Sequence, residues 1–164
     1  MADNPKSGVQ TRKEKPYDER QKLVRTQCFA HAFFIMPVLL LGNVMLLDAG
    51  VPWFDSSIGW LVSFEIAVTL AVVEMIGREA WLPPGAKRSV VWSICYMLLA
   101  LAGMAAWGFL LWHRATYQGI AAVENGILSN DWIYVITFLC AAIVELSYLL
   151  LLLVRRIKNT DEEG

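Results

Sequence analysis

A run of twenty mostly apolar residues, 58–77 (IGWLVSFEIAVTLAVVEMIG), is the feature that most constrains how this chain folds. A helix needs about twenty such residues to cross a hydrocarbon core of roughly 30 Å. The run also contains two acidic residues, Glu65 and Glu74. Because a carboxylate is costly to place inside a bilayer, each of them needs a structural or functional reason to be there. The run therefore predicts a transmembrane helix with two polar positions to explain.

Three further apolar runs predict three more spans, at 26–47, 89–112 and 132–154. Apolar residues make up 57 % of the chain, above the roughly 45–50 % that is usual for soluble proteins. Charged residues gather in the two tails and in the short connections, a partition typical of polytopic membrane proteins. The sequence predicts an all-α fold with a four-helix transmembrane domain, 26–154. A basic and partly disordered tail, 1–25, precedes it, and a short tail, 155–164, follows it.

The distribution of Lys and Arg predicts the orientation of this domain. If the N-terminus is cytoplasmic, thirteen of the fourteen basic residues lie on the inner side and only Arg114 lies outside. Cytoplasmic connections carry such an excess of positive charge. We therefore expect a multi-pass protein of the cytoplasmic (inner) membrane with both termini in the cytoplasm.

The deepest polar residues are predicted to be Glu65 and Glu145. At about 1.5 Å per residue from the centre of each span, Glu65 lies slightly to the outer side of the midplane and Glu145 slightly to the inner side. No basic residue is expected near either depth. Three interpretations stay open, namely a hydrogen bond to a neighbouring helix, a proton-exchanging group, and a contact with a partner subunit. The candidate hydrogen-bonding residues for the first are Asn43, Ser63, Thr69, Thr137 and Ser147.

The other candidate intramembrane contacts lie closer to the membrane surface or outward of Glu65. Nine residues separate Glu65 from Glu74, so at about 100° per residue their side chains point to opposite faces and do not share a site. Arg78 follows Glu74 by one helical turn and predicts an interfacial ion pair. The alternative partner for Glu74 is His31 on the first span, at a similar depth. Asn43 is predicted outward of Glu65.

Motifs for catalysis or cofactor binding are missing from the sequence. There is no GxxxxGK[ST] or GxGxxG phosphate-binding loop and no GxSxG nucleophile motif. The two histidines, His31 and His113, are predicted at opposite membrane faces and so do not share a metal ion or a haem. We expect no catalytic, cofactor-binding or metal-ligating residues, no enzymatic activity and no nucleic-acid partner.

The tetrapeptide Asp18-Glu19-Arg20-Gln21, placed just before the first span, resembles a feature of small bacterial multi-span membrane proteins grouped as a domain of unknown function. The resemblance covers four of the 164 residues. It implies a bacterial inner-membrane protein and carries over no activity. Four-helix multidrug exporters are similar in helix count, but they carry an essential glutamate on their first helix, and the run 26–47 has none.

These features favour a non-enzymatic accessory or interaction subunit of a membrane complex. Its expected partners are the lipid bilayer and either another membrane protein or a second copy of itself. The alternative is a small oligomeric transporter or proton-linked permease that uses the intramembrane carboxylates of Glu65 and Glu145.

Overall fold

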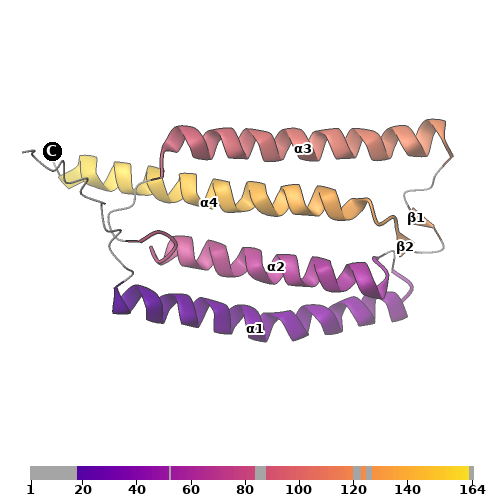
Figure 1. The fold of residues 1–164 in the computed structure, drawn as a ribbon, viewed down its shortest axis with the longest axis horizontal. Coiled ribbons are helices and arrows are strands. Elements are labelled where there is room, and N and C mark those ends of the chain that lie inside the picture. Colours follow the sequence, from indigo (N-terminus) through magenta and orange to yellow (C-terminus); the bar gives the residue numbers. More distant parts are fainter. Residues whose placement is uncertain (1–17, 52, 84–87, 120–122, 125–126, 163–164) are drawn as a thin grey trace, which may run out of the picture.

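The computed structural model describes residues 18–51, 53–83, 88–119, 123–124 and 127–162. Its main elements are four long helices, α1 (Glu19–Asp48), α2 (Ser56–Gly77), α3 (Val90–Tyr117) and α4 (Trp132–Glu162) (Figure 1). Each helix is long and apolar enough to cross a membrane. The predicted all-α polytopic fold is therefore confirmed. Most of the tail predicted to be disordered, residues 1–17, lies outside the described residues.

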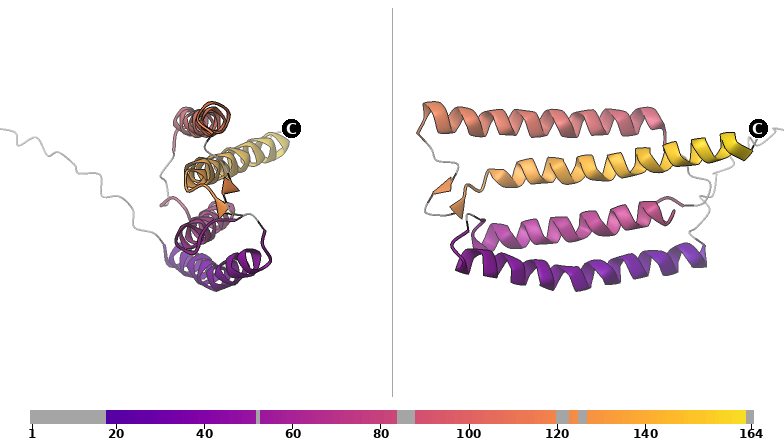
Figure 2. Two further views of the ribbon diagram at one scale, coloured as in Figure 1. Left: turned by 90° about the vertical axis from the view of Figure 1, so that its right-hand side faces the viewer. Right: turned by 180° about the vertical axis from the view of Figure 1, so that it is seen from behind.

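The four helices form a single row rather than a closed bundle. Extensive contacts join α1 to α2, α2 to α4, and α4 to α3, so the order across the row differs from the order along the chain. Seen end-on, the helices lie one beside the next in a shallow layer (Figure 2). Both faces of the inner helices, α2 and α4, are therefore open over part of their length.

Local signals at the helix ends fix the turn between α1 and α2. Gly50 adopts φ +68°, and the N–H of Val51 donates to the carbonyl of Leu46 at 3.0 Å, which ends α1 with a left-handed residue that glycine adopts without strain. Asp55 then caps α2, because its Oδ1 accepts from the amide of Ile58 at 2.9 Å. That hydrogen bond, with a second one from the Ser57 hydroxyl, holds the pKa of the Asp55 carboxyl below its ordinary value.

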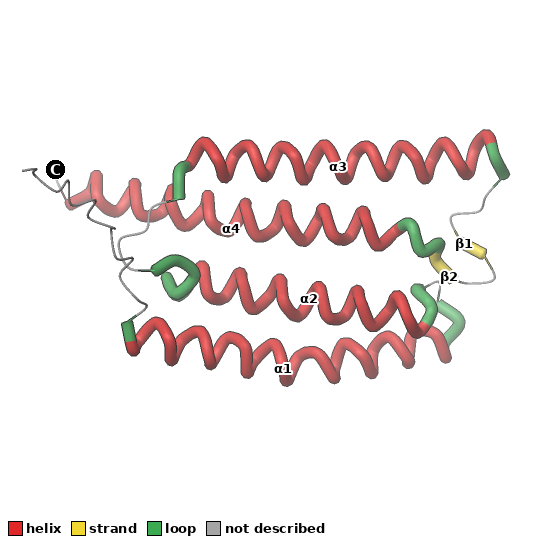
Figure 3. Tube along the Cα trace, viewed as in Figure 1, coloured by secondary structure: helices red, strands yellow, loops and turns green. Residues whose placement is uncertain are grey.

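The connection from α3 to α4 packs on the connection from α1 to α2. It contains a small antiparallel hairpin, β1 (Val123–Glu124) and β2 (Ile127–Leu128), and the amide of Leu128 donates to the Trp53 carbonyl at 2.9 Å. An ion pair between Arg114 and Asp131 joins the end of α3 to the start of α4. This end of the molecule is called the hairpin end below (Figure 3). Helix α3 reaches it at Tyr117, beyond the predicted limit of 112.

The opposite end, called the basic end, carries Arg78, Arg88 and Arg155. Here α2 ends at Gly77, and Glu79 takes φ 59°, a left-handed conformation that is uncommon for a residue with a side chain. Two neighbours hold Glu79 in place. Gln21 of α1 donates from Nε2 to its carbonyl at 3.0 Å, and Arg155 of α4 pairs with its carboxylate at 2.6 Å. The basic end is thus tied together across three helices.

Two glycines allow the helices to approach closely. A side chain at Gly59 of α2 would overlap the carboxamide of Asn43 of α1, which is only 3 % exposed. A side chain at Gly103 of α3 would overlap the ring of Phe138 of α4. Small residues at such points let helices gain van der Waals contact, which is a main source of helix association in a bilayer.

Candidate functional site

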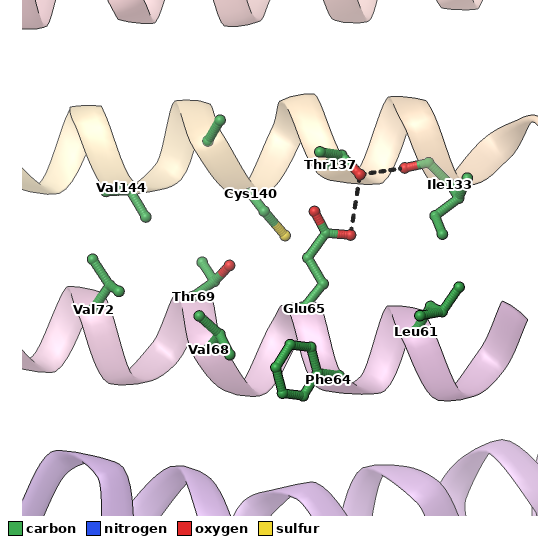
Figure 4. Close-up of a pocket in the computed structure, with 11 residues that line it drawn as sticks. Leu61, Phe64, Glu65, Val68, Thr69, Val72, Ile133, Thr137, Cys140 and Val144 are labelled. Carbon is green, nitrogen blue, oxygen red and sulfur yellow. Dashed lines mark hydrogen bonds between the residues drawn. The ribbon is translucent and has the colours of Figure 1, made fainter.

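An open groove of about 480 Å³ lies between α2 and α4, at the centre of the row. Most of its lining is apolar, and its polar groups are one carboxyl, two hydroxyls and one thiol (Figure 4). We call it the α2–α4 groove. The residues that line it are Leu61, Phe64, Glu65, Val68, Thr69 and Val72 of α2, and Ile133, Thr137, Cys140, Ala141 and Val144 of α4.

Glu65 reaches from α2 toward α4, where the hydroxyl of Thr137 donates to its Oε2 at 3.2 Å (Figure 4). The same hydroxyl lies 3.0 Å from the Ile133 carbonyl, so two acceptors compete for one proton. When the hydroxyl donates to Ile133, its oxygen is free to accept a proton from a neutral Glu65 carboxyl. Thr137 therefore suits either protonation state of Glu65. The contact is of the interhelical kind that the sequence suggested.

Glu74 points the other way, toward α1. Its carboxylate lies 2.9 and 3.0 Å from Nδ1 of His31 and 2.7 Å from a guanidinium nitrogen of Arg78. Arg78 also donates to the side chain of Gln27 at 3.3 Å. Both partners considered for Glu74 therefore bind it at once. Glu65 and Glu74 lie on opposite faces of α2, as the nine-residue spacing requires, and Glu74 belongs to the contact between α1 and α2.

The expectation that Glu145 has no basic residue near it is wrong. Arg88, immediately before α3, places a guanidinium nitrogen 2.6 Å from Glu145 Oε1, and the Glu145 residue is only 8 % exposed. The guanidinium also lies over the rings of Tyr96 and Tyr148, 5.1 and 5.8 Å from their centres. The sequence predicts Arg88 in the connection before the third span. Its long side chain turns back between α3 and α4, and the position of a residue along the chain does not indicate such a turn.

Glu65 and Glu145 also do not form one site. Thr137 marks the level of Glu65 on α4, and Glu145 lies eight residues further along, about 12 Å toward the basic end. Asn43 is also remote from Glu65, because it packs against Gly59, six residues earlier in α2. In the described structure the Asn43 carboxamide oxygen is buried without a hydrogen-bond partner. Of the four predicted intramembrane contacts Glu65, Glu74, Glu145 and Asn43, only Glu65 lines the groove, together with the candidate hydrogen-bonding residues Thr69 and Thr137.

The described residues contain no group of three His, Cys, Asp or Glu side chains able to hold a metal ion. The α2–α4 groove itself offers one carboxyl beside hydroxyl groups on an apolar surface, which suits binding and orientation of an apolar partner. Comparisons with models of protein families, with curated proteins and with solved structures found no match to this chain.

Proposed function

We propose that this chain is a non-enzymatic accessory subunit of the cytoplasmic (inner) membrane, and that it acts by binding another membrane protein. The observation that carries the proposal is the single row of helices with an open, mostly apolar groove at its centre that holds the Glu65 carboxyl. A chain that works alone in a bilayer gains by turning its polar residues inward. Here Glu65 instead lines an open groove, a position that suits contact with a further protein.

The proposed orientation places the basic end in the cytoplasm. Arg78, Arg88 and Arg155 all lie at that end, together with the first described residues of α1 and the last of α4. An excess of Lys and Arg on one side is typical of the cytoplasmic side. Both termini are then cytoplasmic, and the hairpin between β1 and β2 faces outward.

Native mass spectrometry of the chain extracted from its own membrane in nanodiscs or mild detergent tests the proposal. We expect a complex that contains a further membrane protein besides this chain and its lipids, at every detergent concentration that preserves the fold. A lone 18.4 kDa chain, or copies of this chain alone, under all these conditions would contradict the proposal.

A second candidate is a small oligomeric transporter or proton-linked permease that uses Glu65. It is favoured by the two acceptors that compete for the Thr137 proton, since such a site accommodates both protonation states of the carboxyl. A single row of helices encloses no pathway, so several copies would have to surround one. Proton or substrate flux into vesicles with the reconstituted chain tests this candidate. If flux is absent, or if Glu65→Gln leaves it unchanged, the transport function is ruled out.

A further inference from the structure

We propose that the α2–α4 groove binds a transmembrane helix of another protein, and that this helix presents a hydrogen-bond-donating side chain, cationic or amide, at the level of Glu65. The inference rests on the proposed function and names the chemistry of the partner. The shape of the groove, the carboxyl at its centre and the placement of basic residues in the described chain support it.

The shape of the groove fits a ridge of helix side chains. Its lining on α2 runs from Leu61 to Val72, which corresponds to about 16 Å or three helical turns. Side chains spaced three and four residues apart on a partner helix would follow it. Leu61 and Phe64 are 54 % and 55 % exposed along its edge, so a partner would bury them.

The carboxyl of the groove selects the partner. Glu65 is the tenth residue of the 22 in α2, near the middle of the span. Among the described residues its recorded hydrogen bond comes from Thr137, and that donor is shared with a backbone carbonyl. A carboxyl at this depth gains from a further donor, because the alternative surroundings are acyl chains that form no hydrogen bonds.

The described helices do not supply that donor as a cation. The closest described basic group on α1 is His31, which binds Glu74. Glu74 lies nine residues from Glu65, or about 13 Å along α2. Arg88 is engaged with Glu145 at the basic end. Two copies of this chain that met groove to groove would therefore bring two carboxyls together at one depth, so charge complementarity favours a different chain.

A defined probe tests this chemistry. The intact chain in nanodiscs is mixed with a dansyl-labelled synthetic transmembrane helix of Leu and Ala that carries one central Lys. A matched helix has Leu at that position. Binding is followed by energy transfer from the seven tryptophans of the chain. We expect the Lys helix to bind about tenfold more tightly, the size of one hydrogen bond in a bilayer. A Lys moved nine positions toward one end should lose this advantage.

Variants of the chain complete the test. Glu65→Leu should remove the preference for Lys while the helices remain folded, and Phe33→Leu, an exposed position of α1, should keep it. Equal affinity for the Lys and Leu helices, or an unchanged preference in Glu65→Leu, would overturn the inference. Photocrosslinks from a reactive residue at Val68 separate the two proposals. Adducts with a second copy of this chain would refute the inference, and a complex with a further membrane protein in native mass spectrometry would still keep the proposed function. A lone chain in the native membrane would refute the proposed function itself.

Discussion

Replacing Arg88 with Met should destabilise the protein more than any exposed substitution. Arg88 and Glu145 form an ion pair at 2.6 Å whose side chains are only 24 % and 11 % exposed. The replacement leaves the Glu145 carboxylate in an apolar environment with no opposite charge. Breaking a buried pair by removing one partner typically costs about 3–5 kcal/mol of the free energy of unfolding.

The double variant Arg88→Met/Glu145→Met should recover much of this loss. It removes both charges, so no unpaired carboxylate remains, and what is lost is mainly the contact of the guanidinium with two tyrosine rings. At about 0.5–1 kcal/mol for each contact, the double variant should be about 1–2 kcal/mol less stable than the wild type. A double variant that is more stable than the single variant Arg88→Met indicates that the two residues are energetically coupled.

Reversible unfolding in mixed micelles, followed by tryptophan fluorescence, measures these free energies. The matched control is Arg155→Met, which breaks an ion pair with Glu79 whose side chains are 49 % and 59 % exposed and should cost about 0–1 kcal/mol. If Arg88→Met costs no more than this control, or if the double variant is as unstable as the single one, the Arg88–Glu145 pair is not a buried coupled pair and the reasoning is wrong.

Three further predictions concern packing and capping. Gly59→Ala should lower the free energy of unfolding by about 1–3 kcal/mol, because the added methyl group overlaps the Asn43 side chain. Adding Asn43→Ala to the same chain should recover most of that loss. Additive losses in the double variant would contradict the contact between Gly59 and Asn43. Gly103→Ala should lower the free energy of unfolding by a similar amount. Gly108→Ala, whose added methyl group meets no atom within 4 Å, should be neutral or stabilising. Equal losses of stability in the two variants would refute this packing. The low pKa of Asp55 should stabilise the fold at pH values above the unfolded-state pKa, and this contribution should be lost as pH falls through the folded-state pKa. Asp55→Asn should flatten that part of the pH–stability profile, and an unchanged profile would contradict it.

The fold class was predictable because hydrophobic length alone defines a transmembrane helix. The four runs of the sequence match four helices, and the nine-residue spacing of Glu65 and Glu74 placed them on opposite faces of α2. Both inferences use the geometry of one helix at a time, which the sequence specifies directly.

The partner of Glu145 was not predictable in the same way. Its ion pair joins positions 57 residues apart and depends on how α3 and α4 pack. The side chain of Arg88 reaches back along the helix axis from a position that reads as a connection. The row order α1, α2, α4, α3 has the same origin, since apolar runs do not specify which helices become neighbours.

The row order also has a consequence for how the chain assembles in the bilayer. Contacts between α1 and α2, and between α3 and α4, join segments that follow one another, so each pair can form as an independent helical hairpin. The boundary between α2 and α4 joins groups as far apart as Glu65 and Thr137, 72 positions along the chain, and should form last. Further contacts cross this boundary at both ends of the row, from Arg155 to Glu79 and from Leu128 to Trp53. The carboxyl of Glu65 lies on this boundary, so its surroundings are complete only after the two hairpins have docked.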